Sequence, residues 1–512
     1  MMKRVISEAG MTGIFHVMAT LLFAVFFSTS LFITGVNWED RHNENIIIEP
    51  NSPLRMALII VVFGGAMLLL GILYDRVLYR CDRNVLLGMV CIASLLIGIY
   101  WVRSCGAVPE ADQGLVCSYA NAFNDGDFQG IMGGRYMARY MQQLGLVTFL
   151  RGLFLVFGRD NYTAFQYFSA LTVPLLIFSG CQIVRKLSGN NGKAEMYYLA
   201  LIVTCFPMYA YTTFVYGDLS STAVIAFAAW MLLECLEKLT VLRAAALALA
   251  VGAAVQLRRN TLIVLIAFCI VILIRLFRKW DWSVLATGCC VVAGALLLQA
   301  AVVGLYRDWW DDTAQEIPAI LFIAMGLHDT NGYPGWHDNY EYIVFAENGD
   351  DVEVATQIAL EDMQFYLQRF RENPGYMWSF YKYKINSQWQ APLYQSLVMN
   401  KNIQKEQHGL VKIIFDEGIL SGLIKLYMKA FQLFMYGCIL LWLLLRFRKR
   451  PPIESYVLLI AVFGGFLFSI LWEAKTRYVM PYMLLMIPYF GIGMSDLMDR
   501  LLKFAGKLWK KG

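Results

Sequence analysis

Apolar segments of about 20 residues alternate with short polar segments along most of the 512-residue chain. A helix needs roughly 20 mostly apolar residues to cross the hydrocarbon layer of a bilayer. The pattern therefore predicts an all-α, polytopic membrane protein with about twelve transmembrane helices. The predicted spans lie near residues 11–36, 55–74, 84–102, 162–184, 195–215, 219–236, 240–257, 261–277, 283–306, 427–445, 455–472 and 478–497.

Composition agrees with this pattern. The chain is 58% hydrophobic and 16% charged, whereas an average soluble protein is about 45–50% apolar and about 25% charged. The excess of apolar residues is too large for the cores of one or two soluble domains. It excludes a disordered protein, a nucleic-acid-binding protein and an ordinary cytosolic enzyme.

Basic residues are concentrated in alternate loops and in both termini, which places both termini in the cytoplasm under the positive-inside rule. This orientation requires that the apolar stretch 141–157, with Arg151 near its middle, lies in the outer interface rather than crossing. The basic set comprises Lys3, Arg4, Arg76, Arg80, Arg83, Arg185, Lys186, Lys193, Lys238, Arg243, Arg275, Arg278, Lys279, Arg446, Arg448, Lys449, Arg450 and the tail 500–511. The opposite short loops hold only Arg41, Arg55, Arg258, Arg259, Lys475 and Arg477.

Two long segments, 103–160 and 307–426, then face outward. The expected organisation is a transmembrane hairpin over 1–80, and a transmembrane module over 81–306 that includes the first outward segment. An outer domain of helices and irregular loops follows over 307–426. The C-terminal helices and the basic tail occupy 427–512.

Acidic residues next to predicted span ends are the first candidates for chemistry. Glu110 and Asp112 follow the third span, and either could be an ordinary solvated loop acid. Asp218 follows Tyr216 and Gly217 in a very short turn, where it could cap the next helix. A charge at mid-membrane costs at least about 2.5–3.5 kcal/mol, so these positions near water are where charges can be placed cheaply.

Outward basic residues are the second group of candidates. Arg258, Arg259 and Asn260 lie against the positive-inside trend, and they require either an anionic partner or lipid headgroups. A later short turn holds Glu473, Lys475, Arg477 and Tyr478, in which Glu473 and Arg477 could form a structural ion pair.

Together these acids and arginines are predicted to converge on one outer face of the bundle. Carboxylates could accept a proton from a hydroxyl, and guanidinium groups suit phosphate because their planar fork donates two parallel hydrogen bonds. The expected site therefore handles a hydroxyl and a phosphate at the membrane surface.

The ordered set of motifs resembles the GT-C superfamily of polytopic glycosyltransferases, in particular bacterial relatives of protein O-mannosyltransferases and aminoarabinose transferases. The resemblance extends over about residues 100–490. It rests on the outward acid after a span, Phe206-Pro207 with Tyr216-Gly217-Asp218, Arg258-Arg259-Asn260, Glu372-Asn373-Pro374-Gly375-Tyr376 with Lys382-Tyr383-Lys384 and Trp389, and Glu473 with Arg477-Tyr478 and Pro481.

The resemblance implies a membrane enzyme that transfers a sugar from a polyprenyl-phosphate donor to an acceptor on the outer face. The acceptor class stays open among a glycan, a glycolipid, a teichoic acid and a protein, and the expected location is a bacterial plasma membrane. Asp112 is the implied base and Glu110 its alternative. The family acid follows the first span rather than the third, so residues 1–80 are expected to be an added hairpin.

The chemistry would then be a direct, inverting displacement that requires no cofactor. A divalent metal is conceivable through Asp125-Gly126-Asp127, although a turn is the simpler interpretation. The predicted donor-phosphate ligands are Arg258, Arg259, Arg477 and Lys475, and the supporting residues are Asp218, Tyr216, Asn260, Glu473 and Tyr478.

Alternatives of other classes stay open. An O-antigen-ligase-like enzyme would rely on an outer histidine, His328 or His337, more than on Asp112. A lipid or solute transporter is the rival outside the enzymes, although the charges are not at mid-membrane and two similar halves are not visible. Cys105 and Cys117, the two outward cysteines, are either free thiols or a disulfide that ties the loop of Asp112.

Overall fold

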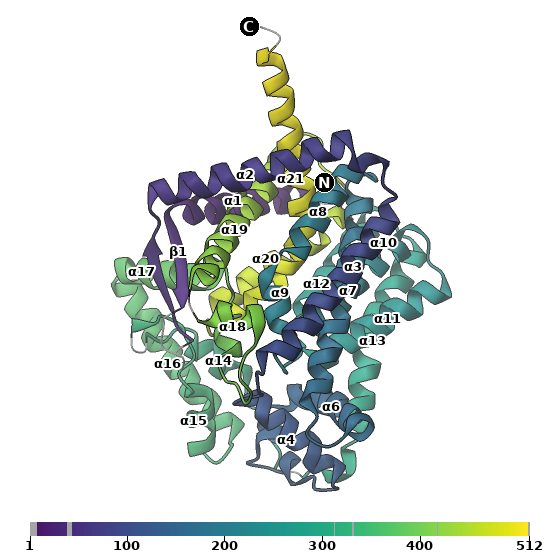
Figure 1. Ribbon diagram of the computed structural model, residues 1–512. Helices are drawn as coiled ribbons and strands as arrows, with labels where there is room; N and C mark the ends of the chain where they lie inside the picture. Colours follow the sequence, from purple (N-terminus) through teal and green to yellow (C-terminus); the bar gives the residue numbers. More distant parts are fainter. Residues whose placement is uncertain (1–7, 38–43, 312, 330–331, 417, 510–512) are drawn as a thin grey trace, which may run out of the picture.

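The computed structural model describes residues 8–37, 44–311, 313–329, 332–416 and 418–509 and is dominated by helices (Figure 1). Within these residues, ten helices are long and apolar enough to cross a membrane, some with a short 3₁₀ turn added at one end. These helices are α1 (Glu8–Phe32), α2 (Pro53–Arg76), α3 (Arg83–Cys105), α7 (Tyr162–Leu187), α10 (Asp218–Glu237), α12 (Leu262–Arg278), α13 (Trp282–Gly304), α19 (Ile419–Leu445), α20 (Val457–Leu471) and α21 (Met480–Trp509).

Two of the predicted spans differ in the structure. The stretch 195–215 is broken into α8 (Gly192–Val203), α9 (Phe206–Ala210) and a 3₁₀ turn over Tyr211–Thr213. Pro207 lies in the first turn of α9 and has no backbone N–H to continue the helix from α8. The stretch 240–257 forms α11 (Val241–Leu257), a shorter apolar helix of 17 residues.

The stretch 141–157 is also short as a helix. It forms α6 (Leu144–Phe157), which has 14 residues. A helix of this length reaches roughly 21 Å at 1.5 Å per residue, less than the roughly 30 Å of a hydrocarbon core. The prediction that this stretch lies in the interface stays a prediction, because its length allows it without requiring it.

A β-hairpin interrupts the predicted all-α architecture between α1 and α2. Strands β1 (Ile33–Asn37) and β2 (Ile46–Pro50) pair antiparallel, with Ile33 opposite Pro50. The run Ile46-Ile47-Ile48 is β-branched and favours a strand, and Ile46 is buried against Trp336 and Ala474. Residues 38–43 between the strands, which include Arg41, lie outside the described residues, as do Lys3, Arg4, Lys510 and Lys511.

The segment 307–426 is mainly helical. Asn373 accepts a hydrogen bond from the backbone N–H of Tyr376 at 3.0 Å, and Pro374 occupies the first turn, so the Asn373-Pro374 motif begins a helix. Small apolar clusters around Phe345 and Phe370 hold these helices together. They are α14 (Ala319–Met325), α15 (Tyr340–Glu347), α16 (Val352–Glu372) and α17 (Pro374–Trp389), whereas α18 (Gly409–Phe415) belongs to a separate cluster with Trp101 and Cys105.

The segment 103–160 contains α4 (Asp112–Asn124) and α5 (Tyr136–Arg139). It does not contain the conceivable disulfide. Cys105 and Cys117 are both free thiols in the described chain, and they are buried in two different apolar clusters. Packing rather than a covalent bond therefore fixes the position of α4.

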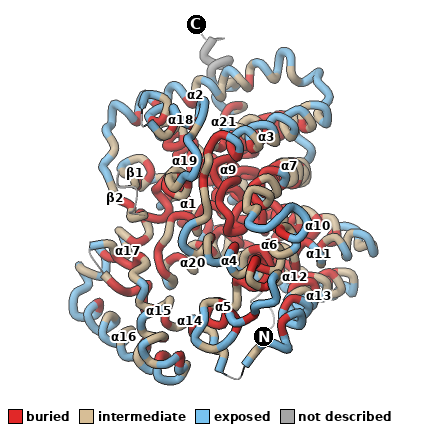
Figure 2. The backbone as a smooth tube through the Cα atoms, turned by 60° about the horizontal axis from the view of Figure 1, so that its bottom comes forward, coloured by how far each residue is buried: buried red, intermediate tan, exposed pale blue. Residues whose placement is uncertain are grey.

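The N-terminal helix α1 and the C-terminal helices α19 and α21 pack in one core. Figure 2 shows buried backbone in the central helices and exposed backbone along α2 and α16. Helix α1 packs along α19, where the Phe26 ring stacks on Trp389 with centroids 4.8 Å apart. The N-terminal hairpin is thus packed against the C-terminal helices, and α17, through Trp389, connects it to the segment 307–426.

Candidate functional site

A cavity of about 1370 Å³ lies between the segment 103–160 and the segment 307–426, which carries α14 and α15. It is bordered by the ends of α12 and α20 and by the turn that follows α20. The structure brings most of the predicted site residues to this cavity: Asp112, Tyr216, Arg258, Arg259, Asn260, Glu473, Lys475, Arg477 and Tyr478 all line it. Glu110 and Asp218 are not among the lining residues.

Asp112 is the first residue of α4, and its two carboxylate oxygens are held by two phenols. The Tyr136 hydroxyl donates to Oδ1 at 3.1 Å, and the Tyr216 hydroxyl donates to Oδ2 at 3.0 Å. The preceding Ala111 has φ of 47° and ψ of −126°, a strained conformation for a residue with a Cβ. This turn separates the two acids, because Glu110 is exposed and accepts a hydrogen bond from Asn402 instead.

Tyr216 connects Asp112 to two arginines. Its ring lies under the guanidinium groups of Arg258 and Arg477, whose Cζ atoms are 4.3 and 5.3 Å from the ring centroid. Its hydroxyl, besides donating to Asp112, accepts a hydrogen bond from Gln143 Nε2 at 2.6 Å. One tyrosine therefore fixes the carboxylate and both cations by cation–π contact and hydrogen bonding.

The backbone around Gly217 allows this arrangement. Gly217 has φ of 83°, and a Cβ at this position would meet Leu257 O at 2.3 Å. The close approach brings Asp218 beside Arg258, with Arg258 Nε 3.5 Å from Asp218 Oδ1. Asp218 therefore acts behind the cavity wall, as a buried partner of Arg258 rather than as a lining residue.

The two arginines are buried, and part of their hydrogen-bonding capacity is unused. The Arg258 side chain is 10% exposed and Arg477 is 7% exposed. Among the described residues, neither Nε atom has a hydrogen-bond partner. Burial alone would lower the pKa of Arg258, but Asp218 and then Tyr216 outweigh it, so the pKa is raised and the guanidinium stays charged. Buried cations that face a cavity form a site for an anion.

The other two predicted cations are already engaged. Arg259 is half exposed and donates to Glu316 Oε1 at 2.6 Å. Lys475 Nζ lies 3.9 Å from Glu44 Oε2. Arg258 and Arg477 are thus better suited than Arg259 and Lys475 to bind an anion that enters the cavity.

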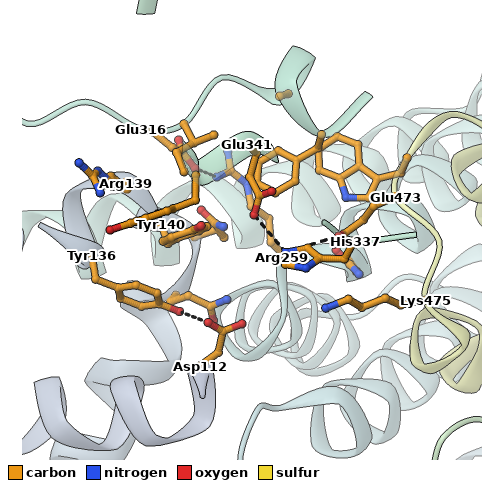
Figure 3. A pocket seen from close by; sticks show the side chains of 18 of the residues that line it. Asp112, Tyr136, Arg139, Tyr140, Arg259, Glu316, His337, Glu341, Glu473 and Lys475 are labelled. Carbon is orange, nitrogen blue, oxygen red and sulfur yellow. Dashed lines mark hydrogen bonds and ion pairs between the residues drawn. The ribbon is translucent and has the colours of Figure 1, made fainter. Parts of the chain in front are cut away.

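The opposite wall of the cavity is built around His337. A short parallel bridge pairs Trp336 with Ala474, and Ala474 N donates to Gly335 O at 2.6 Å. This bridge brings the residues after Trp336 beside the turn 473–475. His337 Nε2 is 3.2 Å from Glu341 Oε1 and 4.0 Å from Glu473 Oε2 (Figure 3).

Buried residues behind this wall hold it in place. Trp336 Nε1 donates to Ser387 Oγ at 3.1 Å. Lys384 Nζ donates to Gly326 O at 2.5 Å and to Ile470 O at 3.0 Å, which joins α14 to α20. Burial lowers the pKa of Lys384 to about 7. Lys384, one of the two lysines of the Lys382-Tyr383-Lys384 motif, therefore supports the wall and does not line the cavity.

Sequence reasoning missed most of this wall. It placed Glu473 and Lys475 at the site, but it considered His337 only for the alternative, ligase-like enzyme, and it did not consider Glu341. The spacing of His337 and Glu341, four residues apart, was the available signal. His328 belongs to a separate cluster, because its Nδ1 is 2.9 Å from Asp338 Oδ2 and it does not line the cavity.

Electrostatics keep the second wall charged. Burial and then Lys475 would lower the pKa of His337, but Glu341 and Glu473 outweigh them, and its pKa is raised. Burial would raise the pKa of Glu473, but Lys475, His337 and a hydrogen bond from Tyr478 outweigh it, and its pKa is lowered. The imidazolium and the carboxylate therefore stabilise each other.

The described residues contain no group of three or more His, Cys, Asp or Glu side chains placed to hold a metal ion. Asp125-Gly126-Asp127 forms a turn. Asp127 accepts from Gln129 N at 3.0 Å, and Asp125 forms an exposed ion pair with Arg159 at 2.6 Å. The simpler interpretation of this motif is therefore the one that the structure supports.

Comparison with known protein families gives a match over most of the chain. A family model described as "conserved hypothetical integral membrane protein" matches residues 11–492. The match begins within α1 and ends within α21, so it includes the N-terminal hairpin and both walls of the cavity. A search of curated proteins found no match.

Proposed function

Since the chain belongs to the family of conserved hypothetical integral membrane proteins, we propose that this multi-pass membrane protein is a glycosyltransferase of the GT-C type. It transfers a sugar from a polyprenyl-phosphate donor to an acceptor on the outer face of a bacterial plasma membrane, with inversion. The observation that carries the proposal is the geometry around Tyr216, which connects one carboxylate, Asp112, to two buried arginines, Arg258 and Arg477, on one cavity.

These groups supply what the reaction requires. As the acceptor oxygen bonds to the anomeric carbon, its proton passes to Asp112. The bond between that carbon and the phosphate oxygen breaks, and the negative charge stays on the polyprenyl phosphate. Arg258 and Arg477 stabilise this charge without the need for a metal. A single base and a direct displacement invert the anomeric configuration.

The membrane-side lining of the cavity supports a lipid-linked donor. Leu262 and Ile263 at the start of α12 and Phe468 in α20 give this part of the cavity an apolar surface. Helix α3 begins at Arg83 in a basic loop and ends just before the acidic segment of Asp112. The cavity is thus at the opposite end of the helices from the basic loops, which favours the outer face.

Sugar transfer by the purified full-length chain in lipid nanodiscs tests the proposal. Each of a panel of undecaprenyl-phosphate sugars is incubated with bacterial envelope acceptors, and Asp112→Asn is compared with the wild type. Removing a general base lowers rate by about 10²–10⁴-fold, so we expect transfer to fall by at least about 10²-fold. Asp125→Asn is the matched control, because Asp125 is an exposed acid away from the cavity.

Retained transfer in Asp112→Asn would contradict the proposed base. One observation favours a second candidate in that case: His337 lines the same cavity. An O-antigen-ligase-like reaction would use His337 in place of Asp112, so His337→Gln would then abolish transfer. Transport of a lipid or solute without any sugar transfer would contradict both enzymes.

A further inference from the structure

We propose that the wall around His337 binds a neutral, polyhydroxylated group, the sugar end of the acceptor, through Glu341 and Glu473. This inference rests on the proposed function and adds the position and the chemical class of the second substrate. It concerns side chains that the donor-phosphate chemistry does not use. Three properties of this wall support such a ligand: its hydrogen-bonding capacity, its charge and the space beside it.

Two carboxylate oxygens on this wall have unused acceptor capacity. Glu341 is 3% exposed and Glu473 is 4% exposed. Glu341 Oε1 contacts His337, and Glu473 Oε1 accepts from the Tyr478 hydroxyl at 2.5 Å. In the described part of the chain, the Oε2 atom of each residue is buried without a hydrogen-bond partner. An unsatisfied buried acceptor is costly, so a ligand that brings hydrogen-bond donors would be favoured.

The charges on the wall disfavour an anion. Three carboxylates border it, those of Glu341, Glu473 and Glu44, and they are paired with His337 and the ammonium of Lys475. An anion would meet these carboxylates, and an ammonium ligand would compete with His337 and Lys475 for them. Hydroxyl groups donate hydrogen bonds to the carboxylates without adding charge, so a sugar fits this wall better than an ion.

The space in the cavity agrees with a sugar. The cavity of about 1370 Å³ exceeds the roughly 300–1,000 Å³ of a pocket for one small ligand. It therefore has room for a donor and an acceptor together. Trp472, which borders the cavity beside Glu473, is stacked by Phe322 and by Phe468, with centroids 4.8 and 5.0 Å apart, and it therefore keeps this part of the wall in place.

The two walls border the same cavity. In Figure 3, Asp112 and Tyr136 lie on one side and His337, Glu473 and Lys475 on the other. Tyr140 lines the cavity as well, and the carboxylates of Glu341, Asp112 and Glu473 all contribute to raising its pKa, after burial. A sugar bound at His337 would therefore share the cavity with Asp112.

Saturation-transfer NMR on the full-length protein in nanodiscs tests this site with methyl glycosides of glucose, galactose and mannose as probes. We expect saturable binding of at least one glycoside by the wild type. Glu341→Gln and Glu473→Gln should each weaken it by at least about tenfold, since both keep the side-chain shape and remove a charged acceptor. Glu347→Gln is the matched control, because Glu347 is exposed on the same helix, α15, and does not line the cavity.

Binding of undecaprenyl phosphate by native mass spectrometry separates this inference from the proposed function. Arg258→Gln should lose the lipid phosphate and keep the glycoside, whereas Glu341→Gln should show the reverse and thereby prove that it is folded. If the wild type binds glycosides but not the lipid phosphate, the proposed function fails and the subsite stands. The inference is overturned if the wild type binds no glycoside, if both glutamate variants bind normally, or if ethylammonium displaces the glycoside by occupying the site.

Discussion

The carboxylates on the two walls of the cavity differ in how their hydrogen-bonding capacity is used. On the wall of Asp112, both oxygens of the Asp112 carboxylate accept hydrogen bonds from tyrosines, and the Nε atoms of Arg258 and Arg477 have no hydrogen-bond partner among the described residues. On the wall of His337, the cations are engaged by carboxylates, and the unsatisfied atoms are carboxylate oxygens of Glu341 and Glu473. The first wall lacks an anion and the second lacks hydrogen-bond donors.

This difference assigns separate tasks to residues of similar type. An acid held by neutral phenols and set opposite cations can accept a proton while the cations receive a phosphate. An acid paired with an imidazolium is held in its charged state and serves better to bind than to react. A single cavity can therefore bind two substrates that differ in charge. Substitutions on one wall should disturb the substrate bound there and spare the substrate bound at the other wall.

The largest effect on binding is expected from substitution of the two cavity arginines. The two variants should also differ from each other in thermal stability. Arg477→Gln and Arg258→Gln should each weaken undecaprenyl-phosphate binding by about 10–100-fold, the value of a charge-assisted hydrogen bond of 1.5–3 kcal/mol. Arg258→Gln also leaves Asp218 buried without its cation, which costs about 3–5 kcal/mol. Native mass spectrometry and thermal unfolding in detergent measure the two quantities.

Arg159→Gln is the control for this pair, because Arg159 forms an exposed ion pair with Asp125 away from the cavity. It should change neither lipid binding nor stability. Equal lipid binding by the wild type and both cavity variants would contradict the assignment of the anion to the Asp112 wall. Equal loss of stability in both would contradict the closer pairing of Asp218 with Arg258, whose Nε lies 3.5 Å from Asp218 Oδ1.

A smaller effect is expected from Tyr216→Phe, which keeps the ring and removes the hydroxyl. The ring still contacts Arg258 and Arg477, so lipid-phosphate binding should stay within about twofold of the wild type. Asp112 loses one of its two hydrogen-bond donors, so sugar transfer should fall by about tenfold through misorientation of the base. A comparison of binding with turnover checks this split, and a loss of binding as large as the loss of turnover would contradict it.

Much of this architecture could be predicted from the sequence. Long apolar runs fix helices because a membrane leaves no other partner for the backbone. The high cost of charge in the membrane explains why Arg258 and Arg477, outward and close to span ends, could be assigned to one site. The break at Pro207 and the β-hairpin at Ile46 were missed, because hydropathy measures apolar length and does not distinguish a continuous span from a broken one or a strand from a helix end.

The finer geometry of the site depended on tertiary contacts. Asp112 and Glu110 are two residues apart, and only the backbone turn at Ala111 shows which of them faces the cavity. Tyr136 and Glu341 belong to segments with ordinary patterns, and they reach the site through the packing of α5 and the pairing of Trp336 with Ala474. No local spacing in the sequence contains this information.

The pH dependence of the free energy of unfolding should also distinguish the two walls, with a smaller effect than the substitutions above. The raised pKa of His337 means that its interaction with Glu341 and Glu473 stabilises the fold fully below pH 6.5 and is lost as the pH rises through the folded-state value, which is above 6.5. The lowered pKa of Glu473 acts in the other direction, since its contribution is present above pH 4.5 and is lost as the pH falls through its folded-state value. The lowered pKa of Lys384, about 7, makes stability rise with pH over part of the range from pH 6 to 9, so the test compares slopes. Thermal unfolding over this range should show the wild type losing stability relative to His337→Gln, and equal slopes in the two proteins would contradict the raised pKa of His337.

The smallest effect is expected at Ala111, on the wall of Asp112. With φ of 47° and ψ of −126°, this residue occupies a conformation that glycine adopts freely and that costs about 1–3 kcal/mol for a residue with a Cβ. Ala111→Gly should therefore stabilise the protein by up to about 1 kcal/mol after the greater freedom of glycine in the unfolded chain is subtracted. Sugar transfer should fall by no more than about twofold, because Tyr136 and Tyr216 still hold the Asp112 carboxylate. Thermal unfolding and turnover measured on the same sample check both expectations. Destabilisation by this variant would mean that the turn is not strained, and the separation of Asp112 from Glu110 would then require a different cause.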